Sequence, residues 1–295
     1  MSDMKKNVKK QILNISFVVV LVAVTMIALL NSNKELNFQS LGDFFSECNY
    51  WYLIGAFIFF LAFVFFEAFS LHIVLKKFGY KSKITSSIAY SASDIYYSAI
   101  TPSASGGQPA SAYYMVRDGI SGGTSGFSLI FNLVGYTAAL LILGGVAFVI
   151  DFNMFLDFVP FVKFLIVFGF VAQIGLLIFF VLCMRKHRQV MAFCGFCVNV
   201  LNKLHIIKNK DKWMGRVGRL VVKYKSCYND FRKNRKTLVW VILCNVAQRL
   251  SQIMISVMVC KSVVDFNMLD VFAMQAFVVL GYNSIPLPGG IGANE

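Results

Sequence analysis

Charged residues are scarce in this chain, at 14% of its 295 residues, whereas an ordinary soluble domain carries about 25%. Proline is also rare, with five residues, while phenylalanine reaches 30 and apolar residues make up 58%. The apolar runs are continuous, without the alternating segments of about ten residues that a membrane β-barrel shows. The composition therefore excludes a soluble domain and a disordered chain, and it predicts an all-α polytopic membrane protein.

The sequence also lacks the short motifs of familiar enzyme chemistry. It contains no GxSxG, HExxH, Walker or dinucleotide-binding motif. Its three histidines are far apart, and the single CxxC, Cys194 to Cys197, has neither a second pair nor a histidine at zinc spacing. We therefore predict no catalytic residue, no metal site and no cofactor for this chain.

Acidic residues are half as frequent as basic ones, 14 against 28, which gives a net charge of +14. Residues 185–236 hold 15 of the basic residues and two acids, so this segment alone contributes +13. We interpret it as a cytoplasmic loop on an anionic membrane surface, where each Lys or Arg is worth about 1 kcal/mol. Its amphipathic stretches, 190–207 and 213–231, are predicted to lie on the inner leaflet. Nucleic acid is the alternative partner, but no recognition motif accompanies the charge.

Five apolar stretches are long enough to cross a bilayer. These predicted spans lie near 12–30, 50–75, 127–150, 160–184 and 238–259. The loops between them alternate between basic and acidic or sparsely charged, and the N-terminal ten residues carry four Lys. The positive-inside rule then predicts a cytoplasmic N-terminus.

Two further segments fit the membrane only as re-entrant hairpins. Residues 84–126 must start and finish on the cytoplasmic side, and they are too polar and Gly-rich for one span. Residues 268–280 are too short to span before the Pro/Gly-rich end, so 268–295 is predicted as a second hairpin entered from the opposite face. The two hairpins weakly resemble each other. Two interpretations stay open with equal weight: an inverted repeat with a site at its interface, or no repeat.

Polar side chains inside the predicted spans are the candidates for function, because they are expensive in lipid. One face of the fifth span carries four of them: Asn245, Arg249, Gln252 and Ser256. A mid-span Arg costs at least about 2.5 kcal/mol on insertion scales, and its planar guanidinium suits phosphate. Two interpretations stay open for Arg249, namely a lipid-phosphate ligand or a structural ion pair with Glu67 or Asp94.

Glu67, deep in the second span, could attract a cationic head group or carry a proton. Alternatively, it could simply pair with Arg249 or stay protonated. The first hairpin offers hydroxyls and free backbone N–H groups that can bind an anion without a cation. The alternative is that its Gly and Ser residues only permit close helix packing. The candidates in this hairpin are Asp94, Thr101, Ser103, Gly106, Gly107 and Gln108.

Three elements together resemble the transmembrane domain of the lysylphosphatidylglycerol synthetase/flippase family, the bacterial multiple peptide resistance factor or phosphatidylglycerol lysyltransferase. They are Thr101-Pro102 with Gly106-Gly107-Gln108-Pro109, the basic central loop, and the closing Pro288-Gly289-Gly290-Ile291-Gly292-Ala293-Asn294-Glu295. The resemblance covers essentially the whole chain in order and spacing. In that family, a soluble C-terminal domain transfers lysine from lysyl-tRNA to phosphatidylglycerol. The membrane domain then carries the product to the outer leaflet, and the less negative surface repels cationic antimicrobial peptides and antibiotics.

The resemblance implies a bacterial inner-membrane flippase whose partner is an anionic phospholipid, phosphatidylglycerol or its lysyl form. On this interpretation Arg249, flanked by Asn245 and Gln252, binds the lipid phosphate. The Gly106-Gly107 and Gly289-Gly290 backbones hold the head group. Its cationic part faces three acids: Glu67, Asp94 and Glu295.

Two other functions remain as alternatives. The chain could take part in lysyl transfer itself, with lysyl-tRNA and a separate transferase domain as partners, so enzyme activity stays open. It could also be a secondary transporter for a small solute, with a sealed aqueous site. The chain ends at Glu295 inside the closing motif and has no room for a transferase domain, so we expect it to be a C-terminally truncated piece.

Overall fold

The chain divides into two units, residues 1–50 and 51–295, and the computed structural model describes most of the second. The described residues are 42, 46–81, 83–101, 105–185, 192, 195, 196, 199, 210–232 and 235–282. In the first unit they include the exposed Glu47 and the buried Cys48. The predicted span near 12–30 lies outside the described residues.

Every described element is an α-helix, which confirms the predicted all-α class. Four of the described helices are long and apolar enough to cross a membrane: α3 (Tyr50–Lys77), α6 (Gly122–Ile150), α8 (Pro160–Arg185) and α11 (Arg235–Lys261). They cover the stretches predicted near 50–75, 127–150, 160–184 and 238–259. The protein is a multi-pass membrane protein.

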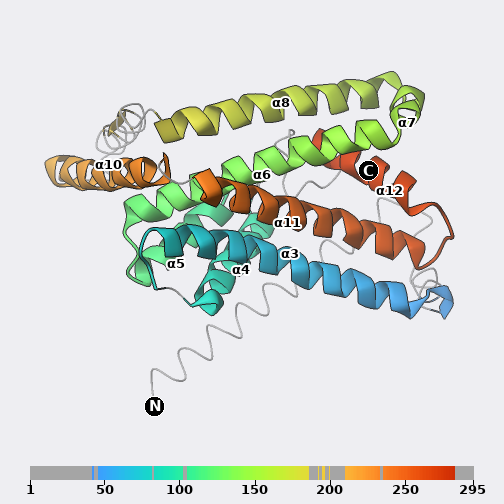
Figure 1. Ribbon diagram of the computed structural model, residues 1–295, viewed down its shortest axis with the longest axis horizontal. Coiled ribbons are helices and arrows are strands. Elements are labelled where there is room, and N and C mark those ends of the chain that lie inside the picture. The colour runs from blue at the N-terminus through green and yellow to red at the C-terminus, as the bar shows by residue number, and fades with distance from the viewer. Residues whose placement is uncertain are drawn as a thin grey trace, which may run out of the picture. The chain divides into compact units, whose positions relative to one another are not determined.

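Further helices lie at both ends of this bundle (Figure 1). At the end where α3 finishes and α6 begins lie α4 (Ile84–Ile100), α5 (Gly107–Arg117) and α10 (Lys210–Arg232). At the other end lies α7 (Phe152–Asp157), and α12 (Met268–Tyr282) starts there. At 1.5 Å per residue, the 15 residues of α12 extend only about 22 Å, less than the roughly 30 Å of a bilayer core.

The segment 84–126 forms a helical hairpin, α4 and α5, and then enters α6. Gly79 and Gly119 have φ values of 82° and 89°, a left-handed conformation that glycine adopts easily, so the chain can turn directly after α3 and α5. Ser121 caps α6 by accepting a hydrogen bond from the Thr124 N–H at 3.2 Å. The re-entry of 84–126 and of 268–295 into a membrane stays a prediction, and residues 283–295 lie outside the described part.

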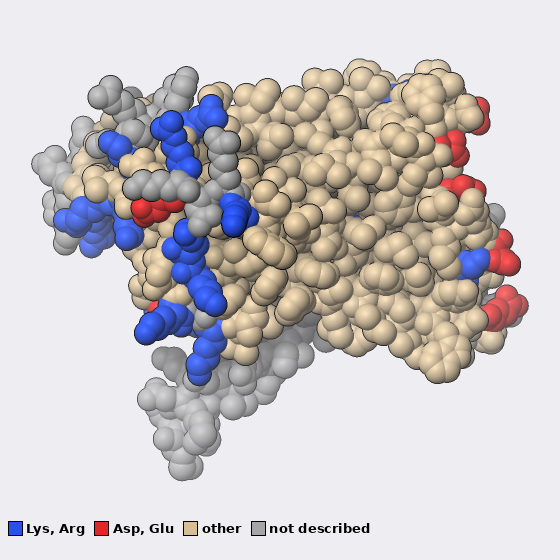
Figure 2. Space-filling view, viewed as in Figure 1, with Lys and Arg blue, Asp and Glu red and all other residues tan. Residues whose placement is uncertain are grey.

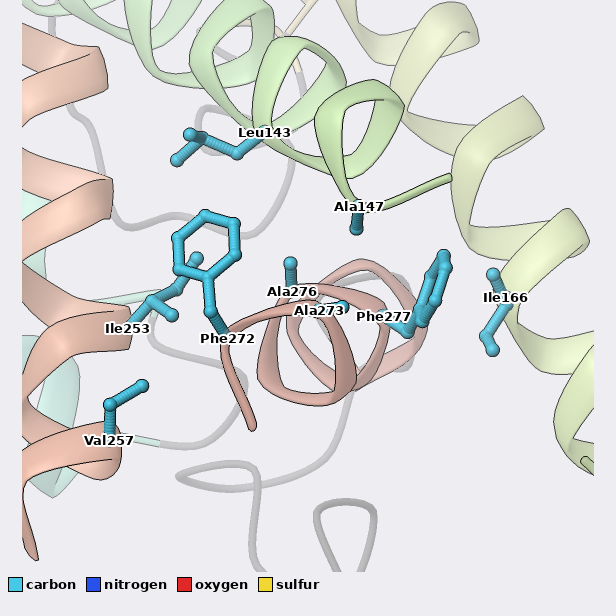
Figure 3. Close-up of a cluster of buried hydrophobic side chains, with 9 residues drawn as sticks. All are labelled: Leu143, Ala147, Ile166, Ile253, Val257, Phe272, Ala273, Ala276 and Phe277. Atoms are coloured by element: carbon cyan, nitrogen blue, oxygen red, sulfur yellow. The ribbon is translucent and has the colours of Figure 1, made fainter. Parts of the chain in front are cut away.

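The α6 helix is the centre of the bundle, with α5, α8, α10, α11 and α12 packed against it. One apolar cluster joins α6, α8, α11 and α12 (Figure 3). In this cluster Phe277 of α12 points between Ala147 and Ile166, while Phe272 points toward Leu143 and Ile253. Glycine permits the close approach of α8 to α12, because a Cβ at Gly169 would overlap the backbone of Leu280.

Basic and acidic side chains gather at opposite ends of the bundle (Figure 2). The last turns of α3, α5, α8 and α10 supply Lys76, Lys77, Arg117, Arg185 and Arg232 to one end. The opposite end carries Asp151 after α6, Asp157 at the end of α7, Asp265 between α11 and α12, and Asp270 in the first turn of α12. Between the two ends, large apolar side chains are exposed on α8, including Phe164, Val171 and Phe179, as expected of a surface that faces lipid.

Part of the apolar surface of the amphipathic α10 packs on the bundle, and its place on the inner leaflet stays a prediction. Val217, Val221, Tyr224 and Cys227 repeat on one face of α10 and are buried. Tyr224 packs edge-on against Phe127 of α6, with 5.2 Å between ring centroids. One apolar stripe of α10 is thus buried against the bundle, while Leu220 and Val222 are exposed, at 44% and 71%, together with the basic side chains Arg216 and Arg219.

Candidate functional site

A polar cavity of about 400 Å³ lies inside the bundle, among five helices. Its lining comes from α3 (Phe63, Glu67), α4 (Asp94, Ile95, Ser98), α5 (Gln108), α6 (Asn132, Leu133, Tyr136) and α11 (Gln248, Arg249, Gln252). The structure therefore brings together five of the residues selected from sequence: Glu67, Asp94, Gln108, Arg249 and Gln252.

Arg249 lies on the wall of this cavity with 7% of its surface exposed. Its guanidinium donates a hydrogen bond to Gln252 Oε1 and lies over two rings, 4.2 Å from the centroid of Tyr136 and 5.3 Å from that of Phe63. Its Nε is buried without a hydrogen-bond partner. Among the described residues Arg249 forms no ion pair, so the ion pair with Glu67 or Asp94 considered from sequence is not present.

Glu67 is equally buried, at 6% exposed, and accepts a hydrogen bond from Gln248 Nε2 at 3.0 Å. Sequence reasoning missed Gln248. A signal for it existed, because Gln248 lies three residues after Asn245 and four before Gln252, spacings that keep side chains on neighbouring positions of one helix face. The Oε1 atom of Gln248 is buried without a partner, so its amide is only half satisfied.

Asp94 lines the cavity and links α4 to α5. Its carboxylate accepts hydrogen bonds from Gln108 Nε2 at 2.5 Å and from Ser98 Oγ at 3.3 Å. Gly107 makes this contact possible, because a Cβ at that position would overlap Asp94 and Ser98. The close-packing role of this glycine, one of the two alternatives considered from sequence, is therefore observed.

The rest of the hairpin turn is held by Thr101. Its Oγ1 accepts a hydrogen bond from the Gly106 N–H at 2.8 Å and donates one to the Tyr97 carbonyl at 2.6 Å. Head-group binding by Thr101 and by the Gly106-Gly107 backbone stays a prediction. The other candidates, Ser103, Gly289, Gly290 and Glu295, lie outside the described residues.

Asn245 faces a network beside the cavity and does not line it. Its Nδ2 donates to Asn132 Oδ1 at 3.1 Å and to Ser70 Oγ at 3.2 Å, and Ser70 Oγ donates to Asn132 Oδ1 at 2.6 Å. These bonds tie α3, α6 and α11 together at one level. Sequence reasoning identified Asn245 but missed Ser70 and Asn132, which lie 175 and 113 residues away from it.

The polar cavity thus combines two buried carboxylates with one buried guanidinium. In a water-poor interior such charges act strongly on a ligand. The guanidinium fits an oxyanion, and the carboxylates fit an ammonium group. No cluster of His, Cys, Asp or Glu suited to a metal ion occurs in the described part of the chain.

Comparison with known proteins gives one match. The model of a family described as "Lysylphosphatidylglycerol synthase TM region" matches residues 11–295. Neither the curated proteins nor the solved structures give a match to this chain.

Proposed function

Because this chain belongs to the lysylphosphatidylglycerol synthase TM-region family, we propose that it binds a phospholipid head group in the polar cavity and carries the lipid across the membrane. The proposed lipid is phosphatidylglycerol, free or carrying an amino acid. The family supports a lipid of this kind, and the charges of the cavity support binding of its head group.

The observation that carries the proposal is the state of Arg249. A cation buried in a membrane domain is costly unless a partner compensates it, yet its Nε lacks a hydrogen-bond partner. Its contacts among the described residues are one amide oxygen and two aromatic faces. A lipid phosphate would supply the missing charge and acceptor, because the planar guanidinium binds phosphate oxygens in a bidentate manner.

The two carboxylates support a head group that also carries an amine. Glu67 and Asp94 line the same cavity as Arg249 but come from different helices, α3 and α4. A lysyl ester of phosphatidylglycerol has phosphate and ammonium groups on one head group, and the cavity offers a complementary charge to each. We therefore assign the phosphate to Arg249 and the ammonium groups to Glu67 and Asp94.

The charge distribution supports an orientation in the membrane. The end of the bundle rich in Lys and Arg (Figure 2) would face the cytoplasm by the positive-inside rule. In a bacterial inner membrane, the lipid would then move from the basic end toward the acidic end. Delivery of an aminoacylated lipid to the outer leaflet would lower the negative surface charge and contribute to resistance against cationic antimicrobial peptides.

The test is a leaflet assay with the chain reconstituted in vesicles that contain lysyl-phosphatidylglycerol. A membrane-impermeant amine reagent would measure the lipid that reaches the outer leaflet. We expect Arg249→Gln to slow translocation by about 10- to 100-fold, since a hydrogen bond to a charged group contributes about 1.5–3 kcal/mol. The matched control is Arg219→Gln, which removes the same charge from the exposed face of α10 and should leave the rate unchanged.

A second variant tests the assignment of the ammonium groups. Glu67→Gln should reduce the preference for lysyl-phosphatidylglycerol over phosphatidylglycerol by about tenfold, a change of roughly 1.4 kcal/mol. Equal rates in the wild type and Arg249→Gln would contradict the proposed function. An unchanged preference in Glu67→Gln would contradict only the role of the carboxylate.

A further inference from the structure

A second cavity of about 500 Å³ lies at the basic end, between α6, α8, α10 and α11. We call it the basic-end pocket, and its lining residues are Phe131, Val134, Val181, Met184, Arg185, Tyr228, Phe231, Arg232 and Leu238. It shares no described lining residue with the polar cavity. Its volume falls within the roughly 300–1,000 Å³ typical of small-molecule sites.

Among the described lining residues of this pocket two are charged, and both are cations. Arg185 is the last residue of α8, and Arg232 is the last residue of α10. Both are exposed, and neither side chain forms a hydrogen bond or an ion pair with a described residue. Two guanidinium groups that line one pocket attract an anion to it.

The remaining walls are aromatic and aliphatic. Phe131 is fully buried, and the ring of Phe231 lies 4.4 Å from it, centroid to centroid. Val181 of α8 and Leu238 of α11 complete the apolar surface. The pocket is therefore amphipathic, with apolar walls next to two cations, which suits an anionic head group joined to a hydrocarbon chain better than a free anion.

The surroundings of the pocket match the depth at which head groups meet acyl chains. Leu182 follows the lining residue Val181, and Trp240 lies two residues after the lining residue Leu238. They are 39% and 58% exposed on α8 and α11. Tryptophan is enriched at the membrane–water interface. The pocket thus lies near the level at which a lipid of the adjoining leaflet places its head group.

We propose that the basic-end pocket is a binding site for an anionic glycerophospholipid, separate from the polar cavity. Its phosphate lies between Arg185 and Arg232, and one acyl chain follows the wall formed by Phe131, Val181 and Phe231. Such a lipid contacts α6, α8, α10 and α11 at once, so it fastens the basic helix α10 to the bundle. The inference does not depend on translocation through the polar cavity.

The test counts the lipids that stay bound to the full chain in native mass spectrometry, from nanodiscs of equal phosphatidylglycerol and phosphatidylcholine. All variants carry Arg249→Gln, so that the polar cavity contributes little. We expect Arg185→Gln with Arg232→Gln to reduce the phosphatidylglycerol preference at least tenfold. The matched control, Arg216→Gln with Arg219→Gln, removes the same charge from α10 outside the pocket and should keep the preference.

A third variant leaves the charge unchanged. Val181→Trp should fill the apolar part of the pocket and also reduce lipid retention, with circular dichroism verifying that the helices are intact. An equal loss in the matched control would overturn the proposal, because the lipid would then respond to general surface charge. Displacement by soluble glycerol phosphate at the concentration of the lipid would also overturn it, because the pocket would then be a plain anion site.

Discussion

The two halves of the bundle share the central helices α6 and α11, but one half buries polar side chains and the other buries apolar ones. On α6, Asn132 and Tyr136 face the polar cavity, while Leu143 and Ala147, two to four turns further on, belong to the apolar cluster with α12. On α11 the change takes one residue, from Gln252 in the cavity to Ile253 in the cluster. We call these regions the polar half, around the cavity, and the apolar half, around α12.

The halves differ most in how completely their buried groups are satisfied. Eight buried side-chain atoms lack a hydrogen-bond partner among the described residues, and none of them belongs to α7, α8 or α12. Four belong to the cavity or the network beside it: Gln108 Oε1, Asn245 Oδ1, Gln248 Oε1 and Arg249 Nε. Unsatisfied buried groups destabilise a fold. The contrast indicates that the apolar half supplies more of the stability, and the unsatisfied groups of the polar half fit the binding role proposed for it.

The largest expected effect on stability is in the apolar half, at Phe277. Its side chain is fully buried and forms edge-to-face contacts with Phe148, at 4.8 Å, and with Phe158, at 6.0 Å between ring centroids. Phe277→Ala should lower the free energy of unfolding by about 3 kcal/mol. We choose the lower end of the usual range because burial from lipid gains less than burial from water.

Reversible unfolding in mixed micelles with increasing SDS would measure this loss. The matched control is Phe161→Ala on α8, where the residue is 68% exposed, and we expect a change within about 0.5 kcal/mol. A loss at Phe161 as large as that at Phe277 would mean that the apolar cluster has no special share in stability.

The next effect concerns the α4–α5 hairpin, where the polar half depends on close packing. Gly107→Ala should cost about 1–3 kcal/mol, because the new Cβ overlaps Asp94 and Ser98 and forces the hairpin open. Gly126→Ala on α6 is the matched control, since a Cβ there meets no atom within 4 Å. It should stabilise the protein by up to about 1 kcal/mol, because alanine favours helix more than glycine does.

The same pair of variants distinguishes the two roles considered for the Gly106-Gly107 turn. A loss of stability in Gly107→Ala, together with a loss of translocation, is the result expected from packing. Unchanged stability with lost translocation would instead support head-group binding by this backbone.

Much of the polar half could be predicted from sequence because single helices reveal their own faces. Arg249 and Gln252 share a helical stripe with Asn245, and a charged residue inside an apolar span is conspicuous by its cost in lipid. The composition likewise gives the all-α membrane class and the long apolar helices. These inferences rest on local periodicity and composition, which can be read directly from the sequence.

The partners of these residues could not be predicted in the same way. Ser70 and Asn132 are polar residues in apolar spans, but nothing in the sequence says that they meet Asn245 across 175 and 113 residues. The aromatic rings that contact Arg249 could not be predicted either, because nothing distinguishes Phe63 from the other phenylalanines among the 30 in the sequence. The packing of α10 on α6 also depends on which apolar face finds which neighbour, and periodicity alone favours a leaflet equally well.

The smallest expected effect on stability, and the sharpest contrast with Phe277, is at Arg249. Arg249→Met keeps a long side chain beside Phe63 and Tyr136 while removing a buried cation whose Nε lacks a partner. The lost hydrogen bond to Gln252 and the lost ring contacts oppose the relieved desolvation, so we expect the free energy of unfolding to stay within about 1 kcal/mol of wild type. Translocation should nevertheless fall as it does in Arg249→Gln. SDS unfolding and the leaflet assay on one preparation would measure the stability and the translocation rate. A loss of stability near that of Phe277→Ala would make Arg249 a structural residue and remove the distinction between the two halves.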